Sequence, residues 1–360
     1  MIETMRARAV GWSIGAPATL GGAIERLGFV QADPIRAPAR AQDLILRHRV
    51  REYRAGDLER RFRRLGVEEE FLYAYGFMPS GTARLLHPRH DPESEDGRHA
   101  PTGLAAEVLA FVRDRGPTHP ADLDERFGRE RAVNGWGAFS KATTRALHSL
   151  HWHGLLRVAY RIDGVRVYEA ALPRPEELAP AERLRRLALL MAHILAPVPQ
   201  ASLQATVSHL AHATRGLEGR RDVVRDLLAS GELERAEAGG QPYVWPADMP
   251  KPPRRSDRQV RFLAPFDPIV WGRRRFEHLW GWPYRFEAYT PASKRQLGYY
   301  AMPLLWGDDV IGWVTCALRD GRLDVNTGFA KPRPRGRDFA TGFDREMARM
   351  ESFLIRSPRK

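Results

Sequence analysis

Leu155-Leu-Arg-Val-Ala-Tyr-Arg-Ile162, the pair Asp163-Gly164 and Val165-Arg-Val-Tyr168 form the stretch that decides the fold of this 360-residue chain. Two runs rich in β-branched and aromatic residues on either side of Asp-Gly indicate a β-hairpin. The segments before the hairpin have helical spacing of apolar residues at 103–115, 117–127 and 140–150, with Ser140 as a possible N-cap. Three helices followed by a hairpin is the order of a winged-helix domain.

The same order recurs downstream and, in divergent form, upstream. The downstream copy is predicted to have helices at 182–194, 202–213 and 220–230, and hairpin strands at 231–236 and 242–245. The first hundred residues are expected to hold a third copy, with helices at 5–12 and 19–27. Polar residues at 90–99 and a Pro-rich stretch at 249–256 are predicted to be linkers.

Beyond residue 256, strand-like runs alternate with turns before a final helix. The expected elements are strands at 258–263, 284–289, 299–305, 310–318 and 322–325, and a helix at 343–355. The predicted fold class is therefore α+β, with three tandem winged-helix (helix-turn-helix) domains and a small C-terminal β-barrel or sheet domain. The predicted domain limits are 1–100, 101–173, 174–250 and 251–360.

Composition favours a nucleic-acid partner. The chain has 57 Lys and Arg against 44 Asp and Glu, a net charge of +13, and a pI near 10.3. Such a balance predicts affinity for a polyanion, with an acidic membrane surface as the competing partner. No apolar stretch approaches the roughly 20 residues that span a bilayer, and the N-terminus lacks a secretory signal. The expected location is cytoplasmic and nucleoid-associated.

Known cofactor and metal signatures are missing from the sequence. Cys316 is the single cysteine, which excludes an internal disulfide and a Cys-based metal site. Neither a phosphate-binding Gly loop nor a zinc-ligand spacing nor a nucleophile elbow is present. We therefore expect no metal and no cofactor.

Gln31-Ala32-Asp33, which follows an apolar run, is the candidate catalytic motif. In an extended segment residues i and i+2 point to the same side, so Gln31 and Asp33 would face one substrate together. A carboxylate on a strongly basic protein indicates chemistry on a polyanion in addition to binding. The structural alternative is that Asp33-Pro34 caps a helix over residues 35–50. Both roles can coexist.

Runs of basic residues are the candidate DNA contacts, since several adjoin aromatic residues such as Trp271, Tyr299 and Tyr300. The residues predicted to contact DNA are Arg36, Arg40, Arg47, Arg49, Arg273, Arg274, Arg275, Lys294 and Arg295.

Four segments resemble the bacterial winged-helix DNA glycosylase family that includes the AlkZ and YcaQ (AlkX) proteins. The matching segments are Leu27-Gly-Phe-Val-Gln-Ala-Asp-Pro-Ile35, Leu150-His-Trp-His-Gly-Leu-Leu156, Leu263-Ala-Pro-Phe-Asp-Pro-Ile-Val-Trp271, and Pro291-Ala-Ser-Lys-Arg295 with Gly298-Tyr-Tyr-Ala-Met-Pro-Leu304. The resemblance implies three winged helices and a β domain around a basic concavity that embraces double-stranded DNA.

The resemblance also implies a reaction. Gln31-Ala32-Asp33 matches the Gln-apolar-Asp signature of the YcaQ branch, which implies removal of N-alkylated purines such as N7-alkylguanine and unhooking of interstrand crosslinks. Asp33 would stabilise the oxocarbenium-like sugar and activate water, and Gln31 would position that water. Family members often carry His where this chain has Ala41-Gln42-Asp43, and again after the Tyr-rich segment, where it has Tyr75-Gly-Phe77.

Two other classes of function remain open. A non-catalytic winged-helix regulator would bind a preferred operator and would commonly be a dimer. An RNA-processing or membrane-surface protein is compatible with charge alone. For the glycosylase we expect a monomer, since three copies in one chain already form an asymmetric cradle.

Overall fold

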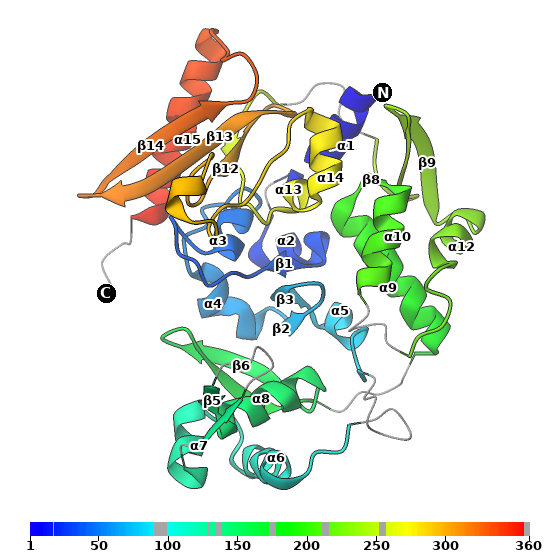
Figure 1. Cartoon of the computed structure of the whole chain (residues 1–360), viewed down its shortest axis with the longest axis vertical. Coiled ribbons are helices and arrows are strands. Elements are labelled where there is room, and N and C mark those ends of the chain that lie inside the picture. The colour runs from blue at the N-terminus through cyan, green and yellow to red at the C-terminus, as the bar shows by residue number, and fades with distance from the viewer. Residues whose placement is uncertain are drawn as a thin grey trace.

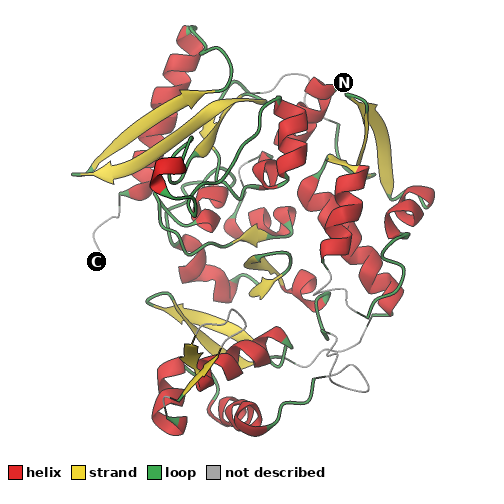
Figure 2. Ribbon diagram, in the orientation of Figure 1, coloured by secondary structure: helices red, strands yellow, loops and turns green. Residues whose placement is uncertain are grey.

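Small antiparallel sheets surrounded by helices make up the molecule (Figures 1 and 2). The computed structural model describes residues 1–16, 18–89, 99–128, 130–133, 139–172, 178–210, 216–251 and 257–355. Most of both predicted linkers, at 90–98 and 252–256, lies outside the described residues. In the described ranges, no helix is long and apolar enough to cross a membrane.

The stretch at 103–170 forms helices followed by a hairpin. Its elements are α6 (Gly103–Arg115), α7 (Pro120–Phe127), β4 (Arg131–Val133), β5 (Phe139–Lys141), α8 (Ala142–Trp152), β6 (Leu156–Ile162) and β7 (Val165–Ala170). The hairpin turn has positive φ at Asp163 (50°) and Gly164 (84°), the conformation that Asp-Gly favours. The expectation that Ser140 caps α8 is wrong, because Ser140 lies in β5 and the helix begins two residues later.

Residues 180–246 have a similar order of elements. They are α9 (Pro180–Leu195), β8 (Val198–Pro199), α10 (Gln200–His209), α12 (Val223–Ala229), β9 (Leu233–Ala238) and β10 (Gln241–Pro246). The three strands form one antiparallel sheet in the order β8-β10-β9. The assignment of three winged-helix domains stays a prediction.

The N-terminal part builds the sheet β1-β3-β2. Its elements are α1 (Ile2–Ile14), α2 (Leu20–Leu27), β1 (Val30–Gln31), α3 (Ala41–Leu46), α4 (Asp57–Arg61), η1 (Phe62–Arg64), β2 (Val67–Phe71), β3 (Tyr75–Pro79) and α5 (Ser80–Arg84). The predicted helix over 35–50 is wrong for most of its length, since only α3 forms. Pro38 lacks an N–H and disfavours helical backbone at the residue before it, so a helix cannot continue there.

Helix α1 packs with the C-terminal part of the chain. Met5 and Ala9 are buried in one hydrophobic cluster with Phe276 and Trp280. Figure 1 shows α1 beside α13 (Pro268–Trp271) and α14 (Arg273–Trp280). Helix α1, which falls within the predicted first domain, therefore packs with the C-terminal part of the chain.

The C-terminal part is an open sheet with a helix across it. Its remaining elements are β11 (Val260–Phe262), η2 (Ala292–Lys294), β12 (Met302–Trp306), β13 (Asp309–Arg319), β14 (Arg322–Phe329) and α15 (Arg337–Leu354). The sheet order β11-β12-β13-β14 follows the chain, and α15 packs against it (Figure 1).

The predicted strand at 284–289 is wrong, because side chains hold this segment as a loop. Tyr284 donates its hydroxyl to the carbonyl of Ala301 at 2.5 Å. The buried carboxylate of Glu287 accepts backbone N–H groups from residues 296–298. These side-chain hydrogen bonds take the place of the backbone hydrogen bonds to a neighbouring strand that a β-strand would need.

Candidate active site

The Gln31-Ala32-Asp33 motif begins on the short strand β1, which is fixed by its partner β3. Gln31 lies opposite Gly76, and the Ala32 N–H continues the pairing by donating to the Tyr75 carbonyl at 2.9 Å. A Cβ at Gly76 would lie 2.4 Å from the Val30 carbonyl oxygen and 2.5 Å from the Phe29 ring. Glycine is thus required at position 76 for β1 to approach so closely.

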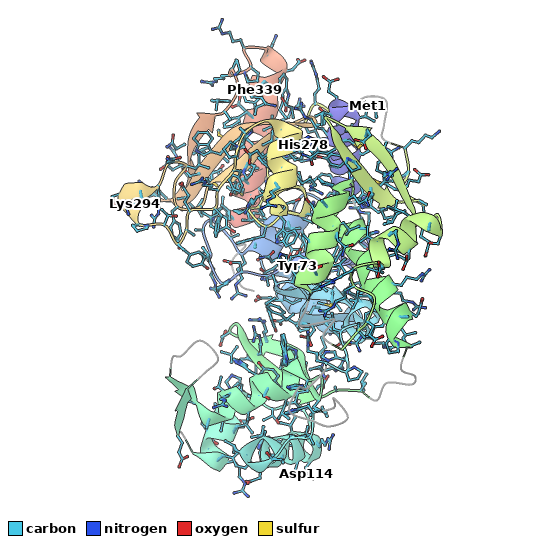
Figure 3. All side chains as sticks on the ribbon, turned by 45° about the vertical axis from the view of Figure 1, so that its right-hand side comes forward. Met1, Tyr73, Asp114, His278, Lys294 and Phe339 are labelled. Carbon is cyan, nitrogen blue, oxygen red and sulfur yellow. The ribbon has the colours of Figure 1, made fainter. Side chains whose placement is uncertain are left out.

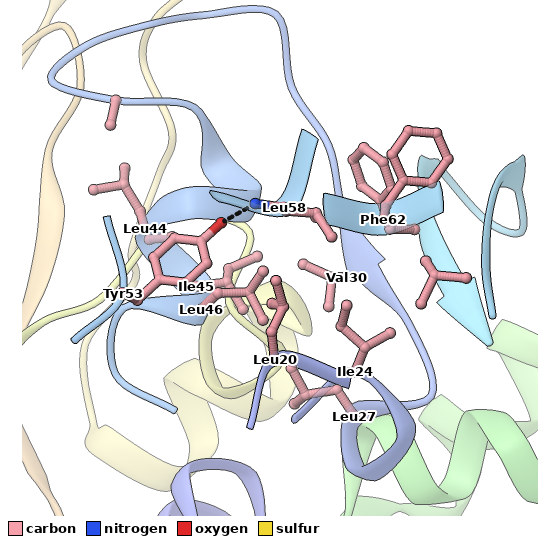
Figure 4. Packing of buried hydrophobic residues seen from close by; sticks show 14 of the residues in the cluster. Leu20, Ile24, Leu27, Val30, Leu44, Ile45, Leu46, Tyr53, Leu58 and Phe62 are labelled. Carbon is pink, nitrogen blue, oxygen red and sulfur yellow. Dashed lines mark hydrogen bonds between the residues drawn. The ribbon is translucent and has the colours of Figure 1, made fainter. Parts of the chain in front are cut away.

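Alternation along this segment separates a core face from a site face. Val30 is fully buried among Leu20, Ile24 and Leu27 (Figure 4), and Ala32 packs against the same hydrophobic cluster. Extended backbone with Val30 and Ala32 on the core side leaves Gln31 and Asp33 on the other side. Gln31 is only 9% exposed, and its Oε1 is buried without a hydrogen-bond partner in the described structure. That oxygen is positioned to accept a hydrogen bond from a ligand or water.

Asp33 is half-buried and uses one carboxylate oxygen locally. The Ile35 N–H donates to Oδ1 at 2.8 Å, which closes a turn, and no helix begins there. The other oxygen, Oδ2, has no hydrogen-bond partner among the described residues. Burial raises the pKa of Asp33 above its usual value, and the bond from Ile35 partly opposes this shift. One oxygen is therefore fixed and the other is free for chemistry.

Tyr289 and Tyr300 from the C-terminal part lie close enough to Asp33 for its charge to act on them. Tyr300 is 3% exposed, and its hydroxyl is buried without a partner in the ranges that the structure covers. Burial, and next the negative charge of Asp33, raise the pKa of both Tyr300 and Tyr289. Sequence reasoning noted Tyr300 only as an aromatic next to basic residues and missed Tyr289. The pair Tyr299-Tyr300 inside a segment that resembles the family was the available signal for Tyr300, whereas Tyr289 lies outside that segment.

Several predicted DNA contacts are available at the surface. Arg36, Arg274 and Lys294 are exposed. Arg295 is half-buried, with its guanidinium 5.0 Å from the Tyr299 ring centre. Arg36 lies three residues after Asp33, and Lys294 lies five residues after Tyr289. Each of these two segments therefore carries an exposed positive charge.

Two further predicted contacts, Arg40 and Arg273, are half-buried with protein partners. Arg40 forms a salt bridge with Glu59. Arg273 donates to the carbonyls of Val270 (2.9 Å) and Pro265 (3.0 Å). These bonds leave less of each guanidinium for a phosphate.

The side chains of Arg47, Arg49 and Arg275 are buried and bonded within the protein, which argues against the prediction that they contact DNA. Arg49 has no exposed area and donates to both carboxylate oxygens of Asp267 at 2.8 and 2.9 Å. The side chain of Arg47 is 4% exposed and pairs with Glu346.

Arg275 is 2% exposed and donates to main-chain carbonyls, including those of Pro268 and Ile269. Burial lowers its pKa to about 10. Arg275 also donates to the carbonyl of Leu195, so all three arginines join the N-terminal or middle parts of the chain to the C-terminal part.

Departures from the family pattern have structural roles here. Asp43 is buried and accepts hydrogen bonds from the Tyr53 hydroxyl at 2.7 Å and the Gly56 N–H at 2.9 Å. Gln42 donates to Glu59 at 3.4 Å. Phe77 is fully buried in the core.

The β6–β7 hairpin reaches the segment after the motif. A Cβ at Gly164 would lie 3.0 Å from an Arg40 nitrogen and 3.5 Å from an Arg36 nitrogen. Beneath the hairpin, the buried carboxylate of Glu69 on β2 accepts from Arg161 at 2.9 Å and Arg166 at 3.3 Å. This ion cluster holds the 103–170 part against the site.

The neighbouring Glu70 is likewise paired. Its carboxylate contacts His87 at 2.9 Å, Arg89 at 3.2 Å and, across the interface, His151 at 3.8 Å. Neither here nor elsewhere in the described residues could a group of three His, Cys, Asp or Glu side chains hold a metal ion.

Comparison with known proteins identifies the family. The chain matches the family model described as "DNA glycosylase AlkZ-like" over residues 24–353. It also resembles the solved structure of Streptomyces sahachiroi DNA glycosylase AlkZ with a TM-score of 0.62 and 14% sequence identity, covering 98% of this chain and 96% of that one. At 14% identity the structural similarity supports the fold alone. The family is shown by the match of the family model, which covers most of the sequence. The chain belongs to the AlkZ-like family of DNA glycosylases and is a DNA repair enzyme.

Proposed function

We propose that this glycosylase hydrolyses the C1′–N9 bond of N7-alkylguanine and related N-alkylated purines in duplex DNA, and unhooks interstrand crosslinks made through such bases. One observation carries the proposal. On the same side of the backbone, Gln31 presents a buried, unpartnered carbonyl oxygen and Asp33 a free carboxylate oxygen.

The chemistry needs little acid catalysis. An N7-alkylated guanine is cationic, so the base leaves with the electrons of the C1′–N9 bond as a neutral product. The positive charge that develops at C1′ and O4′ is stabilised by the Asp33 carboxylate. Water then attacks C1′, its proton passes to Asp33, and an abasic site remains.

Gln31 and the burial of Asp33 support this role. The Gln31 carbonyl can accept a hydrogen bond from the attacking water and so orient its lone pair toward C1′. Because burial raises the pKa of Asp33, this carboxylate is a better proton acceptor than an exposed one.

The test uses end-labelled duplexes that contain either 7-methylguanine or a nitrogen-mustard guanine crosslink. Excision by wild type, Asp33→Asn and Asp344→Asn is read as strand cleavage at abasic sites, at enzyme concentrations that saturate the duplex. Asp344 is an exposed carboxylate on α15, so its loss controls for the change in net charge. We expect Asp33→Asn to lose excision by at least about 100-fold while binding DNA as tightly as wild type.

Two results would contradict the proposal. Full excision by Asp33→Asn would remove the catalytic role of Asp33. Tight binding without excision of either lesion by wild type would show that these are not its substrates.

A further inference from the structure

The loop from Tyr289 to Tyr299, here called the tyrosine loop, exposes two aromatic side chains. Tyr289 is 77% exposed, the highest value among large apolar residues in the described ranges, and Tyr299 is 43% exposed. Between them, η2 carries Lys294, which Figure 3 shows at the outer edge of the molecule. Aromatic rings beside cationic side chains are typical of surfaces that contact nucleic-acid bases and phosphates together.

The tyrosine loop is held in a defined shape from below. Glu287 is 5% exposed, and its Oε2 accepts the N–H groups of Gln296 (2.9 Å), Leu297 (2.7 Å) and Gly298 (3.2 Å). Arg295 spans the loop by donating to the Thr290 carbonyl at 2.8 Å. A buried carboxylate with three main-chain donors fixes the backbone on which both tyrosines stand.

The loop lies next to the catalytic motif through a chain of packed rings. Phe286 contacts Tyr289 with ring centres 6.2 Å apart and Tyr300 with centres 5.3 Å apart, both edge to face. Tyr300 belongs to a hydrophobic cluster against which Phe286, Ala32 and Ile35 pack, and Ala32 and Ile35 lie on either side of Asp33 in the chain. The influence of Asp33 on the pKa of Tyr289 agrees with this proximity.

We propose that Tyr289 and Tyr299 bind the purine ring of the lesion through their ring faces and thereby select cationic, N-alkylated bases over neutral ones. The electron-rich face of a phenol attracts a positive charge, and N7-alkylation places such a charge on the guanine ring. Stacking alone would tolerate every base, whereas this added attraction discriminates between the lesion and undamaged guanine. Glu287 is a positioning residue that keeps the two rings in place. The inference rests on the proposed function for its substrate.

The test compares binding and excision. Equilibrium binding is measured on matched duplexes with 7-methylguanine or guanine at one position, in an Asp33→Asn background. Excision of 7-methylguanine is measured with the same loop substitutions in the wild-type background. The loop variants are Tyr289→Leu/Tyr299→Leu, which removes both rings, and Tyr289→Phe/Tyr299→Phe, which keeps them. Leu172→Ala, a 66% exposed apolar residue elsewhere, is the control.

We expect the double Leu variant to lose about tenfold in preference for the 7-methylguanine duplex and in the rate of excision. The double Phe variant and Leu172→Ala should keep the wild-type preference for the 7-methylguanine duplex and the wild-type rate of excision. Equal loss of affinity for the two duplexes would overturn the inference, because it would make the tyrosines general DNA contacts. An unchanged preference in the double Leu variant would overturn it as well.

Failure of the proposed function would look different. A wild type that does not excise 7-methylguanine refutes that activity, while the preference for the cationic duplex and its loss in the double Leu variant still report on the tyrosines. If wild type excises 7-methylguanine but the double Leu variant keeps the wild-type binding preference, the inference about the tyrosines is refuted and the proposed function stands.

The positioning role of Glu287 is tested by trypsin, which can cut after Lys294 and Arg295 within the loop. We expect Glu287→Gln to be cleaved there at least fivefold faster than wild type and to lose part of the preference for 7-methylguanine. Glu277→Gln, which alters an exposed carboxylate on α14, should behave as wild type. Unchanged cleavage and preference in Glu287→Gln would remove Glu287 from the proposal.

Discussion

Asp33 combines a structural hydrogen bond with the chemistry proposed for it. Its Oδ1 closes a turn with the Ile35 N–H, and its Oδ2 stays free on the side of the backbone that Gln31 shares. Burial disfavours the ionised form that the proposed mechanism requires. The site therefore holds a carboxylate that accepts a proton more readily than a surface aspartate.

A pH profile follows from this shift. The pKa of Asp33 is raised, so the active carboxylate is lost as pH falls through a value above the ordinary Asp range near 3.9. We expect the single-turnover rate of 7-methylguanine excision to be constant near neutral pH and to fall about tenfold per pH unit below that value. The profile is measured with folding monitored at each pH. A rate that stays flat down to pH 4 with the protein folded would contradict the assignment.

Spacing in the sequence made Gln31 and Asp33 candidates, because i and i+2 positions on an extended segment share a side, and their catalytic role stays a prediction. Sequence patterns also placed Arg49 and Arg275 at the protein surface, whereas both are buried. A run of basic residues looks the same whether its side chains face solvent or form internal ion pairs and hydrogen bonds. Arg49 can be buried because the carboxylate of Asp267, more than 200 residues away, accepts two of its hydrogen bonds, and Ser13 and Ile45 accept the others. Partners of this kind are set by tertiary packing and leave no local pattern.

At the scale of elements, β1 is short, and its position depends on close approach to β3. We predict that Gly76→Ala lowers the free energy of unfolding by about 1–3 kcal/mol, because its Cβ would meet the Val30 carbonyl and the Phe29 ring within 2.5 Å. Excision should fall as well, since Gly76 lies opposite Gln31. Chemical denaturation measures the first effect and the duplex assay the second.

Gly81→Ala is the matched control for this prediction. Gly81 lies in α5, and nothing lies within 4 Å of the position of its added Cβ. The substitution should leave stability unchanged or raise it by up to about 1 kcal/mol, because alanine favours helix. Equal stability of Gly76→Ala and wild type would show that the strand pair can separate without cost.

Local signals located some elements correctly and others not. Asp163-Gly164 specified its turn because both residues tolerate positive φ. The expected helix at 35–50 failed at Pro38, a signal that is present in the sequence but that the prediction, made from the Asp33-Pro34 helix start, did not weigh. The expected strand at 284–289 failed for a reason that no local pattern contains, because Glu287 binds main-chain groups about ten residues downstream.

At the scale of the whole molecule, buried charges join parts that are distant in the sequence. Arg49 with Asp267 and Arg47 with Glu346 tie the N-terminal part to the C-terminal part. The net charge of +13 predicted a nucleic-acid partner, and the family match identifies DNA as the substrate class. Composition could not show how many of the cations are used inside the protein.

The contact between β2 and the 103–170 part makes stability depend on pH. Burial alone would raise the pKa of Glu70, but the charges of His151, His87 and Arg89 and a hydrogen bond from His87 outweigh it and lower the pKa to about 2. A depressed acid pKa stabilises the fold fully above the unfolded value near 4.5 and progressively less as pH falls toward 2. The interface should therefore weaken between pH 4.5 and 2.

Glu70→Gln tests this linkage when compared with Glu68→Gln, which changes a half-buried acid on the same strand. At pH 7 we expect Glu70→Gln to lower the free energy of unfolding by on the order of 3 kcal/mol, since it leaves three basic side chains without their acid. The difference from wild type should shrink as pH falls from 4.5 toward 2, because wild type itself loses the charge. Denaturation curves across that range measure the difference, and Glu68→Gln should follow wild type throughout. If the difference in the free energy of unfolding between Glu70→Gln and wild type stays constant with pH, packing and not the charge of Glu70 holds the 103–170 part in place.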